Sequence, residues 1–252
     1  MKIEDAYFLI EKTKKDYDFI FQEFDRTRKR IWPEFQYFKD FFVDGQKILD
    51  FGCGNGRFYF LIQDKNISYY GVDISEKLLF LAKENVKNGQ FFLISKELDL
   101  PFSDNFFDII VCLATFHHIP SFTLRMKLLK EFYRVLKPDG LLILSVWDFY
   151  HGKNKKYLFK IFFDWLKNKI QNKIFKKKPS LDWKDFFVPW KNQKSEVVIN
   201  RYFHAFTLKE LKNLIQKANF KIKESKILSH NEKRNFYNLV VISQKEDQKR
   251  EP

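Results

Sequence analysis

Residues 50–56 read DFGCGNG, and this stretch decides the fold class of the chain. It follows a short apolar strand pattern, KIL at 47–49, and it opens a helical pattern that continues to residue 64. Glycines at 52, 54 and 56 permit a tight turn and close approach of the backbone to a ligand. A dinucleotide-binding loop would carry its third glycine at position 57, where this chain has Arg57. The loop therefore predicts an α/β fold with a ligand site, and it disfavours an NAD-dependent oxidoreductase.

Two acidic residues accompany this loop. Asp50 stands two positions before the first glycine, and Asp73 ends the next strand pattern, ISYYGVD at 67–73. A carboxylate at position 50 suits a cation better than a pyrophosphate, and S-adenosylmethionine carries an ammonium beside its sulfonium. A carboxylate that ends the second strand can accept hydrogen bonds from both hydroxyls of a ribose. We therefore expect S-adenosylmethionine as the ligand; the alternative is a glycine-rich turn with two solvated carboxylates.

The chain on both sides of the loop alternates between strand and helix patterns. Such alternation predicts parallel strands joined by right-handed crossovers. Strands are predicted at 47–52, 67–75, 90–95, 106–114 and 141–147, and near 220–228 and 235–243. Helices are predicted at 54–64, 75–85, 123–137 and 207–220. We expect a doubly wound α/β domain with a mostly parallel sheet.

Two regions depart from this alternation. The pattern of residues 3–42 is helical, with a new helix start at Pro33, because proline is tolerated in a first turn. Residues 151–200 are rich in lysine and aromatic residues and show no clean period. The predicted organisation is an N-terminal helical extension at 1–42, an α/β domain at 43–150 and 201–245, a basic insertion at 151–200 and a polar tail at 246–252.

The net charge of +14 is concentrated in one part of the chain. Residues 1–150 carry 21 Lys and Arg against 22 Asp and Glu, whereas residues 151–234 carry 22 against 7. Segregated positive charge indicates a polyanionic partner such as RNA, or, as the less favoured alternative, an anionic membrane surface. We disfavour a membrane-surface helix because KKKPS at 176–180 interrupts the basic stretch, and we expect its aromatic side chains to pack on the domain. Lys176, Lys177 and Lys178 are predicted to contact RNA phosphates.

Several patterns argue against other classes of protein. The first residues, MKIEDAYFLIEKTKK, place charges where a signal peptide needs an apolar run. The longest apolar segments, near 109–119 and 141–147, are far shorter than the roughly 20 residues that span a bilayer. Cys53 and Cys112 form no CxxC pair, and the five histidines are scattered. We expect a soluble, cytoplasmic protein without a metal site and without a membrane partner.

Three segments resemble the class I S-adenosylmethionine-dependent methyltransferases. They are DFGCGNG with YYGVDIS, then LPFSDNFFDIIVCLA, and then RVLKPDGLLILSVW. The resemblance implies a Rossmann-like, seven-stranded sheet of order 3-2-1-4-5-7-6 and S-adenosylmethionine as cofactor. It also implies an adenine contact just after the third strand, commonly an acid, where this chain has Lys96 followed by Glu97. The implied cofactor-binding residues are Asp50, Gly52, Cys53, Gly54, Asn55, Gly56, Asp73, Ile74, Glu97, Leu98 and Leu113.

A narrower resemblance covers most of the chain. The segments FDRTRKRIWP at 24–33, HHIP at 117–120, SVWD at 145–148, FVPW at 187–190, RYFHAFTLKEL at 201–211 and NFYNLVVISQK at 235–245 carry it. They are similar to the tRNA wobble-uridine methyltransferases, which esterify the carboxylate of 5-carboxymethyluridine. The resemblance implies tRNA as a partner, together with a small zinc-binding activator subunit.

Four residues are candidates for handling the methyl acceptor: Arg28, His117, Arg201 and His204. An arginine fork can bind a carboxylate, and the indole of Trp32 near Arg28 can stack on a base. A histidine after the fourth strand lies at the edge where α/β sheets bind ligands, and it can position an acceptor or act as a base. A solvated arginine, a packed histidine and an ordinary strand at 201–206 remain the alternatives. A carboxylate acceptor is ionised at neutral pH and needs no base.

Two other functions are compatible with parts of the sequence. A small-molecule methyltransferase of the quinone or lipid type would share the glycine loop, but it would not need the segregated charge. A non-catalytic RNA-binding protein of the same fold would not need the intact DFGCGNG and Asp73. We therefore favour an enzyme that acts on tRNA.

Overall fold

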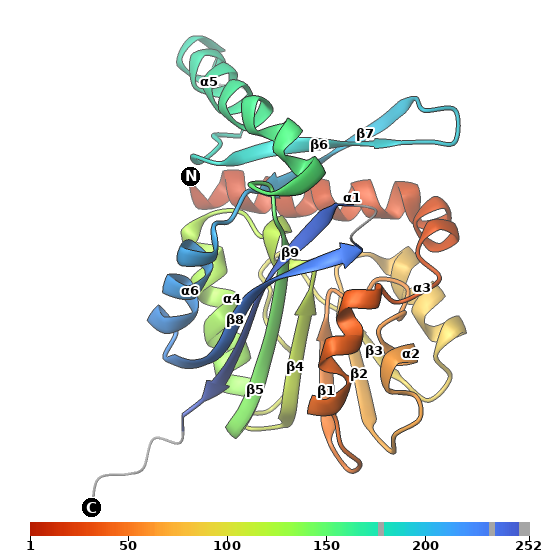
Figure 1. The fold of residues 1–252 in the computed structure, drawn as a ribbon. Helices are drawn as coiled ribbons and strands as arrows, with labels where there is room; N and C mark the ends of the chain where they lie inside the picture. Colours follow the sequence, from red (N-terminus) through yellow and green to blue (C-terminus); the bar gives the residue numbers. More distant parts are fainter. Residues whose placement is uncertain (176–178, 232–234, 247–252) are drawn as a thin grey trace, which may run out of the picture.

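A seven-stranded sheet forms the centre of the computed structural model, which describes residues 1–175, 179–231 and 235–246 (Figure 1). Its strands are β1 (Lys47–Phe51), β2 (Ser68–Asp73), β3 (Gln90–Leu93), β4 (Phe107–Leu113), β5 (Leu136–Trp147), β8 (Phe220–Asn231) and β9 (Phe236–Lys245). Their order is β3-β2-β1-β4-β5-β9-β8. The first five strands in this order, β3, β2, β1, β4 and β5, pair in parallel, and β9 lies antiparallel between β5 and β8. This arrangement confirms the predicted fold class and the order 3-2-1-4-5-7-6.

Apolar residues alternate between the two faces of the sheet because successive side chains of a strand point in opposite directions. In β1, Leu49 and Phe51 pack with α1 (Ile3–Thr27), α4 (Phe122–Val135) and α6 (Leu208–Lys217). Ile48 points to the opposite face, toward the 3₁₀ helix η1 (Pro33–Phe41) and α2 (Tyr59–Ile62). The helix α3 (Glu76–Asn85) follows β2 and contacts α1. Both faces of the parallel strands are therefore covered, as the doubly wound architecture requires.

The helix predicted after the glycine loop is much shorter than its pattern indicates. Only Tyr59–Ile62 is α-helical, and the turns around it are closed by bonds between residues three apart. The N–H of Gly56 donates to the oxygen of Cys53, and that of Tyr59 donates to the oxygen of Gly56. Tight turns of this kind replace the first turns of a regular helix. The apolar pattern of residues 58–62 reflects burial under η1 rather than a long helix.

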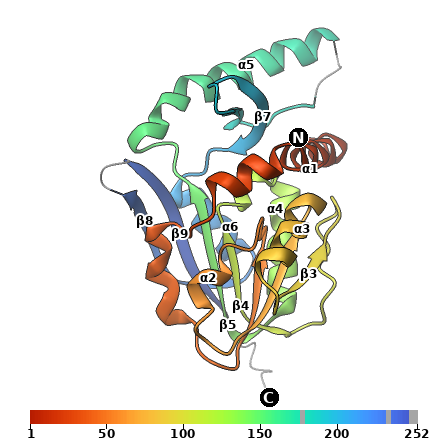
Figure 2. The same cartoon turned by 90° about the vertical axis from the view of Figure 1, so that its right-hand side faces the viewer.

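Helix α1 lies across the carboxyl ends of the parallel strands, and the insertion packs on its other side (Figures 1 and 2). The insertion contains the 3₁₀ helix η3 (Gly152–Tyr157), the helix α5 (Leu158–Phe175) and the antiparallel hairpin of β6 (Asp185–Lys191) and β7 (Val197–His204). Leu9 of α1 packs with Leu181 and Tyr202 of the insertion. The hairpin extends through residue 204, so the boundary placed at 201 falls inside β7. Lys176, Lys177 and Lys178 lie outside the described residues.

No described helix is long and apolar enough to cross a membrane. Among the described residues, no group of three or more His, Cys, Asp or Glu side chains is arranged to hold a metal ion.

Candidate active site

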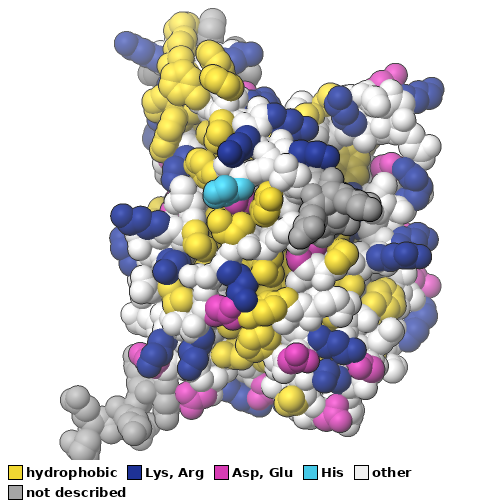
Figure 3. All heavy atoms as spheres, viewed as in Figure 1, with side chains coloured by type: hydrophobic (Ala, Val, Ile, Leu, Met, Phe, Trp, Pro, Cys, Tyr) yellow, Lys and Arg dark blue, Asp and Glu magenta, His cyan; other side chains and the backbone are white. Residues whose placement is uncertain are grey.

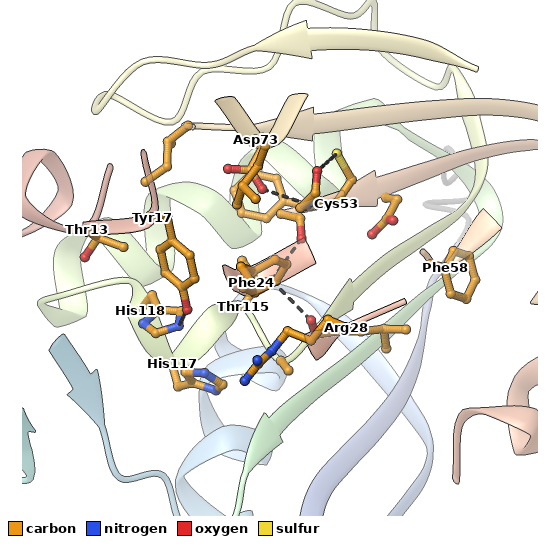
Figure 4. Close-up of a pocket in the computed structure, with 18 of the residues that line it drawn as sticks. Thr13, Tyr17, Phe24, Arg28, Cys53, Phe58, Asp73, Thr115, His117 and His118 are labelled. Carbon is orange, nitrogen blue, oxygen red and sulfur yellow. Dashed lines mark hydrogen bonds between the residues drawn. The ribbon is translucent and has the colours of Figure 1, made fainter. Parts of the chain in front are cut away.

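One pocket lies at the carboxyl ends of β1, β2, β4 and β5, where open α/β sheets bind their ligands. Helix α1 closes it on one side with Thr13, Tyr17 and Phe24, and β7 contributes Arg201 and Phe203. Figure 4 shows Asp73 and Cys53 on one side of this pocket and Arg28, His117, His118 and Tyr17 on the other. The first side consists of the glycine loop and the end of β2, and the second is formed by α1, β7 and the segment after β4.

The glycine loop is held against β2 by its backbone. The N–H groups of Gly52 and Cys53 both donate to the carbonyl oxygen of Val72, at 2.8 and 3.0 Å. Gly52 has a φ of 72°, and a Cβ at this position would lie 2.2 Å from Cγ2 of Thr115. No side chain fits there without displacing the segment that follows β4. Only glycine fits at position 52, because Thr115 occupies the space that a side chain would need.

Asp73 connects the end of β2 to this loop. One carboxylate oxygen accepts the N–H of Gly54 at 2.9 Å, and the other accepts the N–H of Ser75 at 2.9 Å. Burial is the main reason that the pKa of Asp73 is raised to about 6, and the backbone N–H donors oppose this shift. The carboxylate lines the pocket beside Ile74.

Asp50 is a buried carboxylate at the carboxyl end of β1. Its Oδ2 accepts the hydroxyl of Tyr69 at 2.6 Å. Burial raises the pKa of Asp50 to about 7, and the charge of Asp73 adds to this rise, whereas Tyr69 and Arg57 oppose it. A cationic ligand in the pocket would stabilise the ionised form of this carboxylate.

Arg57 is the first residue of the site whose role sequence reasoning missed. Its guanidinium lies over the ring of Trp32, 4.4 Å from the centroid, and it lines the pocket near Asp50. Burial lowers the pKa of Arg57 to about 10. Its Nη1 is buried and finds no hydrogen-bond partner among the described residues. Asp50 and Arg57 thus offer an anion and a cation donor to a ligand that carries both an ammonium and a carboxylate.

The other predicted cofactor residues divide into two groups. Cys53, Gly54, Leu98 and Leu113 line the pocket, together with Asp50, Gly52, Asp73 and Ile74. Gly56, Asn55 and Glu97 are not among the lining residues. A Cβ on Gly56 would meet Val86 and Ala82, so this glycine permits the loop to pack on α3.

Asn55 links the glycine loop to the end of α1. Its Nδ2 donates to Oδ1 of Asp25 at 2.9 Å and to the carbonyl oxygen of Arg28 at 3.2 Å. The side chain therefore fixes the backbone of an acceptor-side residue relative to the loop that the sequence assigned to the cofactor.

His118 belongs to an ordered hydrogen-bond chain on the acceptor side. Its Nδ1 lies 2.7 Å from the carbonyl oxygen of Tyr202, so Nδ1 carries the proton. Its Nε2 then accepts the hydroxyl of Tyr17 at 2.8 Å, and that hydroxyl accepts Nη1 of Arg201 at 3.3 Å. Burial lowers the pKa of His118 to about 3, so the ring is neutral. The hydrogen bonds therefore all point the same way, from Arg201 to Tyr17 and from Tyr17 to His118.

His117 is also a neutral donor. Its Nδ1 accepts the backbone N–H of Trp147 at 3.2 Å, which leaves the proton on Nε2. The ring stacks on Phe203 with 4.6 Å between centroids, and burial lowers its pKa well below the usual range. With its acceptor nitrogen occupied, His117 can position an acceptor but has no free lone pair with which to remove a proton.

Arg28 and Arg201 both pack their guanidinium groups on the ring of one aromatic residue. Their guanidinium carbons lie 4.3 and 4.8 Å from the ring centroid of Trp190, which β6 supplies. Burial and the charges of Arg201 and Arg57 lower the pKa of Arg28 to about 9. Among the described residues, neither Arg28 nor Arg201 has an acidic side chain within ion-pair distance, and Nε of Arg201 has no hydrogen-bond partner. The cluster has excess positive charge that an anion would neutralise.

His204 lies away from this cluster. Its Nδ1 lies 2.6 Å from Oδ1 of Asp185, and its Nε2 lies 2.8 Å from Oε1 of Glu210. Both nitrogens are used, the ring is buried, and it does not line the pocket. The structure thus brings Arg28, His117 and Arg201 together, and it places His204 in a bridge between the hairpin and α6.

Tyr17, Phe24 and Phe203 line the pocket, and Trp190 contacts Arg28 and Arg201, although none of them was predicted as a site residue. A signal for the first two is present in the sequence, since Ile10, Tyr17 and Phe24 are seven residues apart and share one face of α1. Trp190 lies in the segment FVPW, which contributed to the resemblance but received no role. Its role depends on the packing of the insertion over α1, and no local pattern contains that information.

Comparison with known proteins finds methyltransferases. The sequence model of the methyltransferase domain matches residues 49–144. The chain is 34% identical over 131 residues to the tRNA (carboxymethyluridine(34)-5-O)-methyltransferase of Arabidopsis thaliana, covering 52% of this chain and 31% of that protein. It is 30% identical over 207 residues to a putative methyltransferase of Encephalitozoon cuniculi, covering 82% of this chain and 85% of that protein. The chain thus spans less than a third of the Arabidopsis relative.

Solved structures share the fold. A S-adenosylmethionine-dependent methyltransferase from Methanosarcina mazei superposes with a TM-score of 0.66 at 24% identity, covering 86% of this chain and 99% of that one. The putative methyltransferase in complex with the Haloferax volcanii Trm112 methyltransferase activator gives a TM-score of 0.64 at 15% identity, covering 94% and 98%. At these identities the likeness shows the fold alone.

Proposed function

The chain belongs to the class I S-adenosylmethionine-dependent methyltransferases, and from this premise we propose that it esterifies the carboxylate of a modified wobble uridine in tRNA. The observation that carries the proposal is the cluster of Arg28 and Arg201, beside which the described residues of the acceptor side offer no free base. Among the described residues that line the acceptor side, both histidines are neutral and have their acceptor nitrogens occupied. An acceptor that must lose a proton would find no base there, whereas a carboxylate is ionised at neutral pH.

Arg28 and Arg201 supply the binding half of this proposal. Two guanidinium groups on one indole ring repel each other, and burial strengthens the repulsion. An acceptor carboxylate between them would relieve the repulsion and accept charge-assisted hydrogen bonds. Trp190 keeps both cations in place through its ring face, and Asn55 fixes the backbone of Arg28. The chain therefore orients the nucleophile and excludes water from it, which is the assistance that an ionised nucleophile needs.

The residues on the other side of the pocket fit the cofactor. Asp50 is a buried carboxylate suited to an ammonium, Arg57 has an unpartnered donor suited to a carboxylate, and Asp73 ends β2 where a ribose binds in this fold. S-adenosylmethionine, when bound, supplies an electrophilic methyl group on a positively charged sulfur. The glycines of the loop let its backbone pass close to Thr115, to Phe24 of α1 and to the end of α3.

Three further parts of the proposal concern partners and organisation. The names of the relatives and the positive charge of residues 151–234 support tRNA as substrate. We assign phosphate contacts to Lys176, Lys177 and Lys178, which lie outside the described residues, and a cytoplasmic location follows from the proposed substrate. The resemblance, together with the likeness to the Haloferax protein, supports a small zinc-binding activator as a further partner. We further propose the organisation expected from the sequence: an N-terminal extension, a methyltransferase domain, a basic insertion and a tail. In this organisation β7 belongs to the insertion.

Mass spectrometry of tRNA nucleosides tests the proposed function. The enzyme is incubated with tRNA and isotope-labelled S-adenosylmethionine, with and without an activator subunit, and the digested nucleosides are analysed. We expect the label in a uridine methyl ester that mild alkali hydrolyses to the acid. Label in a metabolite extract but not in tRNA would support a small-molecule methyltransferase instead. Failure of the protein to bind S-adenosylmethionine in a calorimetric titration would favour a non-catalytic RNA-binding protein.

A further inference from the structure

Helix α5 has its polar side turned toward the protein. Asn168 accepts the N–H of Leu181 at 2.8 Å and donates to the carbonyl oxygen of Pro179 at 2.8 Å. Asp164, one turn earlier, accepts the N–H of Phe187 at 3.1 Å. Ile161 is buried on the same side. These bonds fix the orientation of the helix, because rotating it would leave buried polar groups without partners.

The outward side of α5 is apolar. Phe159 is 78% exposed, Phe163 is 59% exposed and Ile174 is 64% exposed, and Phe162, Leu166 and Ile170 lie exposed between them. Viewed down the helix axis, these positions fall within an arc of about 120° and therefore share one face of the helix. The prediction that these aromatic side chains pack on the domain is wrong for Phe159, Phe162 and Phe163. Figure 3 shows the hydrophobic side chains gathered over this projecting helix, with lysines beside them.

Lysines border the apolar face along its length. On a helical projection, Lys169 lies beside Phe162 on one edge and Lys167 lies on the other, while Lys173 lies between Phe162 and Leu166. The one acidic residue of α5, Asp164, is paired with Lys160 at 2.8 Å on the inner side. Trp183 extends the apolar surface, since it is 51% exposed and its ring lies 6.5 Å from that of Phe162.

We propose that α5 docks on the surface of an anionic lipid bilayer, with Phe159, Phe163 and Ile170 inserted among the acyl chains and the lysines at the headgroups. A one-sided apolar face with basic edges and nearby tryptophan is the arrangement of helices that lie in a membrane interface. The resemblance to tRNA methyltransferases favours RNA instead, and the sequence also argued against such a helix because KKKPS interrupts the basic stretch. The structure removes that objection, because α5 runs without a break for 18 residues and ends at Phe175, before this motif.

Other occupants fit the surface less well. A second copy of the chain would bring together two insertions with the same excess of positive charge. RNA would use the lysines and could stack on phenylalanine, but Leu166, Ile170 and Ile174 offer it nothing. A protein groove would need apolar walls with acidic rims along the whole helix. A bilayer would contact both the apolar side chains and the lysines of α5. The proposal does not depend on the identity of the methyl acceptor.

Vesicle co-sedimentation tests this proposal on the full chain. The protein is mixed with vesicles of phosphatidylcholine alone or with phosphatidylserine at about a quarter of the lipid. We expect binding to the anionic vesicles that weakens with salt, and little binding to the neutral ones. The double variant Phe163→Ser and Ile170→Ser should lower the partition coefficient at least about tenfold, since it removes two inserted side chains. Calorimetric titration with S-adenosylmethionine verifies that each variant remains folded.

A matched control removes exposed apolar side chains elsewhere. Phe8 and Phe19 of α1 are 56% and 68% exposed, and their double change to serine should leave vesicle binding unchanged. The proposal is overturned if the wild type does not bind anionic vesicles more tightly than neutral ones, or if the control variant loses binding to the same degree. Loss of tRNA binding in the α5 variant with unchanged lipid binding would identify the face as an RNA surface and would also overturn it.

Discussion

Cofactor affinity should depend on pH through Asp50. Burial raises the pKa of this carboxylate to about 7 in the free protein, and a cationic ligand binds its ionised form. The sign follows directly: protonation competes with the ligand, so affinity is low below pH 7, rises as pH increases through 7 and levels off above it. With a pKa near 7, the ionised fraction is about one eleventh at pH 6 and about ten elevenths at pH 8, so the dissociation constant should fall about tenfold.

Calorimetric titration of S-adenosylmethionine at pH values from 6 to 8 measures this slope. The change Asp50→Asn should weaken binding at pH 8 and remove the part of the dependence centred near pH 7. Asp73, whose pKa is raised to about 6, accounts for any slope that remains at the acidic end. The change Tyr69→Phe offers a matched control, because it removes the 2.6 Å hydrogen bond that favours the ionised carboxylate and should move the midpoint to higher pH. A flat profile in the wild type, or a full slope in Asp50→Asn, would refute the assignment of Asp50 to the ammonium.

Three other predictions concern separate parts of the protein. The change Asp73→Ala should weaken cofactor binding by roughly 2–3 kcal/mol in calorimetry, since it removes the predicted ribose acceptor; unchanged affinity would contradict the role of this residue. The change Trp190→Leu should raise the KM for tRNA several-fold while the dissociation constant for cofactor stays constant, and Trp190→Phe should restore much of the loss because it keeps a ring face beside both guanidinium groups. Changing the three lysines at 176–178 to glutamate should raise the Kd for tRNA at least about tenfold and flatten its salt dependence in filter binding; wild-type binding across the salt range would exclude the phosphate contacts.

The pocket wall made by the glycine loop and Asp73 was predictable because the strands that carry it are adjacent. The loop at 50–56 and Asp73 sit at the carboxyl ends of adjacent parallel strands, and register alone brings them together. The glycines have the predicted freedom, with positive φ at Gly52, Gly54 and Gly56. The loop sequence also predicted a longer helix than α2, because burial of residues 58–62 under η1 gives the same apolar pattern as a helix face.

The acceptor side was only partly predictable because it is built by long-range packing. Arg28 and Arg201 were found through motifs, but the ring that holds them belongs to β6, and Tyr17 joins the site only through the path of α1. His204 stands in the same motif as Arg201, yet alternation along β7 and the neighbouring Asp185 direct it elsewhere. The neutral state of His117 and His118 follows from burial and bond direction, which a sequence does not contain.

The central claim is that an ionised carboxylate is methylated without a general base. The most direct test compares initial rates on two forms of one tRNA, in which the wobble uridine carries either a carboxymethyl group or the neutral carbamoylmethyl group of nearly the same shape. We expect methyl transfer to the carboxylate, and a rate at least about a hundredfold lower on the amide, because the amide has no charge for Arg28 and Arg201 to bind. Equal rates on the two tRNAs, or faster transfer to the amide, would contradict the account.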